Sequence, residues 1–141
     1  MDKTKQLANG IEMPRLGLGV WRVEDNDATN SVKWAIENGY QLIDTAAVYK
    51  NEQGVGEGIR QSNTKREDLF ITTKLWNTDQ GYDSAHQAFN DSLERLGFGR
   101  LPVNRTMKYL KILRATFHLM KSTFFAYSRD NFRAISWWIM F

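Results

Sequence analysis

Cysteine is absent from this sequence of 141 residues, which excludes disulfide bonds and thiolate metal sites. There is also no apolar run of about eighteen residues, so we expect neither a membrane-spanning helix nor a membrane partner. The opening stretch MDKTKQLANG lacks the apolar core of a signal peptide, and we therefore expect a cytoplasmic protein. Hydrophobic residues at 42% and charged residues at 25% are typical of a globular domain with a core.

Glycine and acidic residues are missing from the last third of the chain. All ten glycines lie before residue 100, and Asp130 is the one acidic residue after it. Residues 1–99 carry 11 Lys and Arg against 15 Asp and Glu, a net charge of −4. Residues 100–141 carry 8 against one, a net charge of +7, and half of the 18 aromatic residues. This shift predicts a boundary between residues 1–99 and a basic, aromatic tail, residues 100–141.

The pattern before residue 100 predicts a hairpin followed by alternating strands and helices. Asn9 and Gly10 supply a tight turn within KQLANGIEM. Three strand-like runs follow, namely LGLGVW, YQLIDTA and DLFITTKLW. Helical periodicity covers residues 25–40, 51–62 and 83–97. Strands alternating with helices predict an α/β fold with a parallel sheet covered by helices.

The helix ends are predicted from capping residues. We expect Asp27 and Asp83 to cap the helices over 25–40 and 83–97, because a short acidic side chain accepts from free backbone N–H groups. Gly39 and Gly97 end these helices, since glycine readily adopts a positive φ. In the tail, only KYLKILRATFHLM has a helical pattern, and the rest has no clear period.

Three polar residues lie at the ends of the predicted strands or on the loop that follows one of them. Asp44 ends one strand, Lys74 ends the next, and Tyr49 lies on the loop after Asp44. In a parallel sheet these side chains emerge at the carboxyl rim, where such folds place active sites. An ammonium beside a tyrosine stabilises the phenolate, and an aspartate holds the ammonium in place. This combination predicts a proton donor suited to a carbonyl oxygen that receives a hydride on its carbon.

Each of these residues also has a structural interpretation. An aspartate at a strand end is commonly a cap or turn residue. A tyrosine in a loop commonly packs half-buried, and a lysine at a strand end is commonly solvated. The residue types and their order therefore leave both interpretations open.

The motifs GLGVW, LIDTAAVYKNE and ITTKLWN, in this order and spacing, resemble the N-terminal half of the aldo-keto reductase family. The resemblance runs from about Lys5 to Phe98, includes REDLF and SLERLG, and is greatest to the bacterial diketo-gluconate and glyoxal reductase branch. It implies the N-terminal part of a (β/α)8 TIM barrel preceded by a β-hairpin. Such a barrel needs about 250 residues, so the resemblance also implies a truncated barrel.

The resemblance assigns roles to individual positions. Asp44, Tyr49 and Lys74 match three members of the family's catalytic tetrad, with Tyr49 as proton donor. Gly19, Val20 and Asp44 match positions that bind the cofactor, which the resemblance implies is NADPH. Trp21 and Trp76 match aromatic positions of the substrate pocket, and the implied substrate is a small aldehyde or ketone.

The resemblance breaks after SLERLG. The family continues with a segment like DYVDLYLIHWPV, whose histidine completes the tetrad, whereas this chain reads FGRLPVNRTMKYLKILRAT. His86 and His118 do not fit that motif, and we interpret both as surface or packing residues. Echoes such as LPV and RDNF indicate a degenerate remnant with a deletion, whereas the composition after residue 100 indicates a frameshifted tail. Both remain open here.

Three hypotheses follow for function. The chain is an NADPH-dependent reductase by family, an inactive fragment that self-associates through an exposed half-barrel core, or a binding module that uses its basic aromatic tail. The tail lacks an RNA-binding motif or a clear amphipathic period, so we expect no nucleic-acid partner. The segment GVGEGIR resembles a dinucleotide fingerprint, but its glycines fall inside a predicted helix, which excludes that interpretation. We favour the family assignment, with little activity in this chain by itself.

Overall fold

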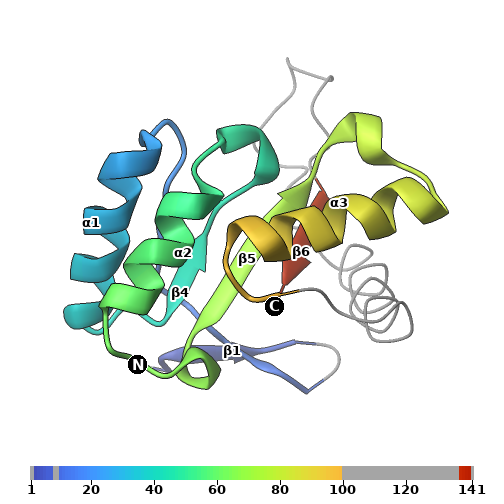
Figure 1. The fold of residues 1–141 in the computed structure, drawn as a ribbon. Helices are drawn as coiled ribbons and strands as arrows, with labels where there is room; N and C mark the ends of the chain where they lie inside the picture. The colour runs from blue at the N-terminus through green and yellow to red at the C-terminus, as the bar shows by residue number, and fades with distance from the viewer. Residues whose placement is uncertain (1, 8–9, 100–136, 141) are drawn as a thin grey trace, which may run out of the picture.

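The computed structural model describes residues 2–7, 10–99 and the backbone of 137–140 (Figure 1). The order of elements confirms the predicted hairpin and the alternation of strands and helices. The elements are β1 (Thr4–Gln6), β2 (Glu12–Pro14), β3 (Gly17–Gly19), α1 (Asp25–Glu37), β4 (Leu42–Asp44), α2 (Glu52–Gln61), β5 (Phe70–Leu75), α3 (Tyr82–Arg95) and β6 (Trp137–Met140). Short 3₁₀ turns lie at Ala47–Tyr49, Arg66–Asp68 and Asn77–Asp79.

Two sheets are present in the described part of the chain. β1 and β2 pair antiparallel as the hairpin, and the second sheet has the strand order β3-β4-β5-β6. β3, β4 and β5 are parallel, with Gly19 level with Asp44 and Asp44 level with Thr72. Their carboxyl ends therefore meet at one rim. This is a partial α/β fold without a closed barrel among the described residues, as the sequence predicts.

The core lies between this sheet and its helices. Helices α1, α2 and α3 lie side by side on one face of the sheet (Figure 1). Ile43 and Ile71 point from β4 and β5 into a buried apolar cluster that also holds Val32, Val55 and Ile59 from α1 and α2. The helical periodicity of residues 25–40 and 51–62 is thus the burial pattern of two helices packed on a sheet.

The predicted N-caps are wrong, whereas the predicted C-terminal glycines are confirmed. α1 begins after Glu24 and α3 after Gly81, and neither has a side-chain cap. Both helices start earlier than expected, so Asp27 and Asp83 lie inside the first turns, where a negative charge still favours the helix dipole. Gly39 has φ +89° and its amide donates to Ile36 at 2.9 Å.

The glycines of GVGEGIR serve helix packing. A Cβ on Gly54 would lie 1.9 Å from the backbone oxygen of Asp25, and one on Gly58 would lie 2.5 Å from that of Thr29. The Gly54 amide donates to the Asp25 carboxylate at 2.8 Å. α1 and α2 therefore approach backbone to backbone, which only glycine permits. This segment lies within α2 and does not form a strand-to-helix turn.

Part of the tail joins the sheet. β6 runs antiparallel to β5, with Trp138 level with Lys74 and Trp137 level with Leu75. The sequence predicted no structure for this segment. The predicted helix over KYLKILRATFHLM and residue His118 lie outside the described residues. Within the parts that the structure describes, no helix is both long enough and apolar enough to cross a bilayer.

Candidate active site

The parallel register brings Asp44 and Lys74 to the same side of the sheet. Asp44 is level with Thr72, and Lys74 lies two residues further along β5. Because side chains two residues apart point to the same face of a strand, Asp44, Thr72 and Lys74 share one face. The chain then turns through Ala47–Tyr49, and Lys50 reverses it with a φ of +58°. This turn places Tyr49 over the rim.

Lys74 is the centre of a hydrogen-bonded cluster with Asp44 and Tyr49. Its Nζ atom donates to Asp44 Oδ2 at 2.8 Å, to the backbone oxygen of Thr45 at 3.0 Å and to Tyr49 Oη at 3.1 Å. Asp44 Oδ1 accepts from Thr72 Oγ1 at 2.5 Å. The structure thus brings together the three predicted tetrad residues, with the lysine between the carboxylate and the phenol.

Burial of this cluster raises the pKa of Asp44. The Lys74 side chain is 7% exposed and the Asp44 side chain is 22% exposed. Burial raises the pKa of Asp44 above its ordinary value of 3.8, although hydrogen bonds from Lys74 and Thr72 and the positive charge of Lys74 act to lower it. The loss of hydration therefore outweighs the stabilisation of the carboxylate by its partners.

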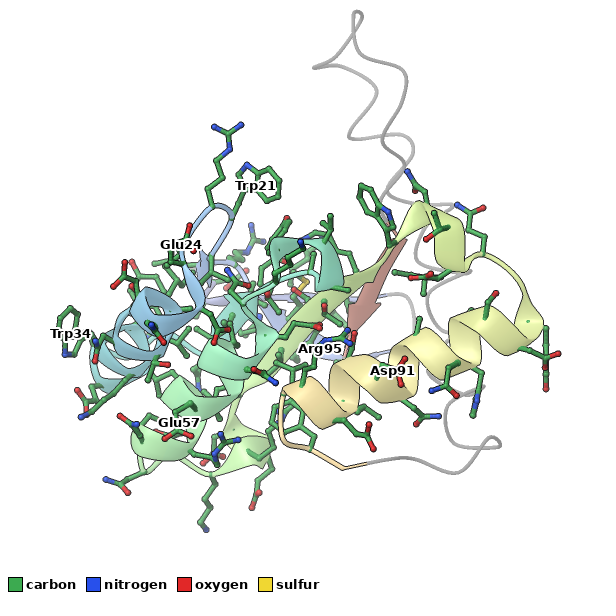
Figure 2. All side chains as sticks on the ribbon, turned by 45° about the horizontal axis from the view of Figure 1, so that its top comes forward. Trp21, Glu24, Trp34, Glu57, Asp91 and Arg95 are labelled. Atoms are coloured by element: carbon green, nitrogen blue, oxygen red, sulfur yellow. The ribbon has the colours of Figure 1, made fainter. Side chains whose placement is uncertain are left out.

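Trp21 packs against Tyr49 of the cluster, and Trp76 lies directly after β5. The Trp21 and Tyr49 ring centroids are 4.6 Å apart and the rings are tilted by 59°. Trp21 is 56% exposed and projects from the loop between β3 and α1 (Figure 2). Trp76 follows β5 directly and is 37% exposed. Both tryptophans present aromatic surface to solvent near the rim.

The predicted cofactor positions lie at the end of β3. Val20 is fully buried and its amide donates to the backbone oxygen of Asp44 at 3.1 Å, which ties the ends of β3 and β4 together. Gly19 is exposed, and a Cβ built on it would meet no atom within 4 Å. A ligand can therefore approach the backbone here. The Asp44 carboxylate adds acceptor capacity, because each of its oxygens has two lone pairs.

The sequence did not identify two buried residues beside the site. Asn51 is fully buried and links Thr45 to the loop between β3 and α1. Glu52, 1% exposed, accepts from Thr73 Oγ1 at 2.6 Å and from Arg95 Nε at 2.6 Å, with Arg95 reaching over from α3 (Figure 2). Buried polar residues give no hydropathy signal. The available clue was their place directly after a turn that follows a strand.

His86 has a packing role on α3. It is half-buried, and its ring nitrogens lie 3.4 and 3.5 Å from Asn90 Nδ2, one helical turn away. This agrees with its interpretation as a surface or packing residue. Among the described residues, no group of three His, Asp or Glu side chains is placed to hold a metal ion.

Comparison with known proteins identifies relatives of this chain. The model of the aldo/keto reductase family matches residues 13–102. The chain is 63% identical over 97 residues to the glyoxal reductase of Bacillus subtilis, covering 68% of this chain and 35% of that protein. It is 47% identical over 91 residues to the methylglyoxal reductase DkgA of Escherichia coli K12, covering 64% and 32%.

An aldo-keto reductase of Mycolicibacterium smegmatis is 42% identical over 120 residues, covering 80% of this chain and 44% of that protein. Residues 1–99 make up 99 of the 141 residues, or 70% of the chain, which is less than the 80% that this alignment covers. The similarity to this relative therefore continues beyond Gly99. The chain thus spans between 32% and 44% of the length of these curated relatives.

Solved structures of aldo-keto reductases are also similar to this chain. The aldo/keto reductase of Brucella melitensis has a TM-score of 0.65 and 49% identity, covering 67% of this chain and 37% of that chain. An aldo-keto reductase of Bombyx mori, solved in complex with NADP, has a TM-score of 0.63 and 40% identity, covering 67% and 34%. With the family match, the parallel strand register and the Asp44–Lys74–Tyr49 cluster all in agreement, this chain belongs to the aldo/keto reductase family.

Proposed function

We propose that this chain carries the proton-donating part of a reductase site, and that in a complete barrel it reduces small aldehydes and ketones to alcohols with NADPH. The observation that supports this most strongly is the cluster in which Lys74 Nζ contacts both Asp44 and Tyr49. The relatives named as glyoxal and methylglyoxal reductases suggest small dicarbonyl compounds as the substrate class.

In this proposal Tyr49 donates its Oη proton to the substrate carbonyl oxygen. Lys74, held by Asp44 at 2.8 Å, keeps a positive charge beside the phenolate that remains. Asp44 prevents the ammonium from turning away from Tyr49. Bound NADPH supplies the hydride. General acid catalysis of this kind typically contributes about 10²–10⁴-fold to a rate.

The substrate and the cofactor have separate proposed contacts. Trp21 and Trp76 provide aromatic surface that positions a small carbonyl compound over Tyr49. The open backbone of Gly19, the neighbouring Val20 and the carboxylate of Asp44 fit the nicotinamide and ribose end of the cofactor. We assign no described residue to the cofactor phosphates.

We further propose that the 141-residue chain by itself has no measurable turnover. The tetrad histidine is absent from its expected place after SLERLG. Loops after the seventh and eighth strands of such barrels commonly bind phosphate, and the resemblance of this chain ends well before them. Holding reactants in position can supply about 7–11 kcal/mol of barrier lowering. A proton donor without a positioned hydride donor lacks that larger contribution.

A chimaera tests the proposed role of Tyr49. Residues 1–98 are fused to the corresponding C-terminal part of the Bacillus subtilis glyoxal reductase, and NADPH consumption with glyoxal is followed by nicotinamide absorbance. We expect turnover in the parent chimaera and a loss of about 10²–10⁴-fold in kcat/KM with Tyr49→Phe. Tyr82→Phe, at a 63% exposed tyrosine on α3, is the matched control and should leave kcat/KM unchanged. Equal activity of the two variants would contradict the proposal.

A further inference from the structure

Asn51 occupies the N-cap position of α2 but does not cap that helix. An asparagine at this position commonly accepts a hydrogen bond from the first turn through its side chain. Here no side-chain cap bond forms, and the residue is fully buried. Its side chain instead forms hydrogen bonds with other segments of the chain.

The Asn51 amide joins two loops at the carboxyl rim. Nδ2 donates to the backbone oxygens of Val20 and Val23, each at 2.8 Å, and Oδ1 accepts from Thr45 Oγ1 at 2.8 Å. Because a carbonyl oxygen can only accept, the NH₂ group must face Val20 and Val23, which fixes the orientation of the amide. Three of the four hydrogen bonds that an amide side chain can form are made without water.

These hydrogen bonds close the two loops that carry the aromatic residues of the site. The bond between Thr45 and Asn51 closes the loop that contains Tyr49. The bonds to Val20 and Val23 close the loop that contains Trp21. The two rings meet at 4.6 Å, and Lys74 Nζ bonds to the backbone oxygen of the same Thr45. The buried amide of Asn51 therefore connects the segments that carry Tyr49, Trp21 and the backbone oxygen that accepts from Lys74.

We propose that Asn51 is a positioning residue, which sets the contact between Tyr49 and Trp21 and thereby the place where a carbonyl substrate meets the proton donor. The catalytic meaning of this inference rests on the proposed role of Tyr49. The geometric claim does not, because it concerns the relative placement of two rings in the chain as it exists. Loss of a buried hydrogen-bond hub also destabilises a fold, so stability alone cannot test it.

The test is a spectroscopic measurement on the 141-residue chain. Isotope-labelled protein gives NOE cross-peaks between the ring protons of Trp21 and Tyr49. We expect Asn51→Ala to abolish these cross-peaks while those between α1 and α2 remain. Asn38→Ala is the matched control, since it removes another asparagine amide that donates to a backbone oxygen, that of Trp34 at 2.7 Å. Retained Trp21–Tyr49 cross-peaks in folded Asn51→Ala would overturn the proposal.

A second pair of variants decides the question if Asn51→Ala fails to fold. Thr45→Val removes only the hydroxyl that donates to Asn51, whereas Thr45→Ser keeps it. We expect weakened ring cross-peaks in the valine variant and restoration in the serine variant. Identical cross-peaks in both variants would overturn the proposal. Neither outcome depends on turnover, so failure of this inference is distinguishable from failure of the proposed function, which would appear as equal activity of Tyr49→Phe and Tyr82→Phe in the chimaera.

Discussion

Replacing Lys74 by methionine tests the ion pair of the site most sharply. Methionine keeps much of the side-chain length but removes the ammonium that donates to Asp44, Thr45 and Tyr49. Removing one partner of a buried ion pair typically costs about 3–5 kcal/mol. Water reaches the Asp44 side chain, which is 22% exposed, so we expect a smaller loss of unfolding free energy near neutral pH, about 2 kcal/mol.

The loss should depend on pH with a definite sign. The folded-state pKa of Asp44 is already raised above 3.8, mainly by burial, and loss of the Lys74 charge raises it further. For an acid with a raised folded-state pKa, protonation favours the fold. The stability that such an acid contributes is therefore fully present when the pH is below its ordinary pKa, and it is lost as the pH rises through its folded-state pKa. The penalty of Lys74→Met should shrink as pH falls towards 3.8.

Urea unfolding followed by circular dichroism, near pH 7 and near pH 4, measures this difference. The double variant Lys74→Met with Asp44→Asn should be more stable than Lys74→Met near pH 7, because it leaves no unpaired carboxylate. A carbon-13 NMR titration of the wild-type Asp44 carboxyl should give a midpoint above 3.8. An equal penalty at both pH values, or a midpoint at or below 3.8, would refute this account of the charges.

Two further pairs of variants test the packing and the ion pairs around the site. Gly54→Ala should lower the unfolding free energy by about 1–3 kcal/mol, because its Cβ would lie 1.9 Å from a backbone oxygen of α1. A Cβ on Gly19 would meet no atom within 4 Å, so Gly19→Ala should change the unfolding free energy by less than about 1 kcal/mol. Equal effects of the two variants in urea unfolding would contradict this packing. Arg95→Ala should cost about 1.5 kcal/mol because it leaves the buried Glu52 carboxylate without its cation, whereas Arg60→Ala, in an exposed pair, should cost less. A smaller loss for Arg95→Ala than for Arg60→Ala would contradict the assigned role of Glu52.

Periodic segments were predictable from the sequence because burial imposes their pattern. Val32 and Ile36 on α1, like Val55 and Ile59 on α2, are four residues apart, and all lie in the core between the helices and the sheet. The placement of Asp44 and Lys74 followed from their positions at the ends of consecutive parallel strands. A local pattern therefore sufficed wherever one face of an element is buried against a neighbour.

Features that depend on long-range contacts were not predictable. Asp25 bonds to α2 at Gly54, and Asn51 holds a loop about thirty positions earlier in the chain, so neither role is visible in local sequence. β6 pairs antiparallel with β5, and no local pattern specifies that direction. The short apolar run WWIM is typical of a strand but does not specify a partner.

The most direct test of the account is NADPH consumption by the 141-residue chain with glyoxal, compared with the same chain carrying Tyr49→Phe. The account holds that Asp44, Tyr49 and Lys74 assemble a proton donor, and that turnover also requires a firmly held cofactor. It therefore predicts the uncatalysed rate for both proteins. Turnover well above that rate, lost on Tyr49→Phe, would contradict it by showing that the 141-residue chain positions the hydride donor by itself.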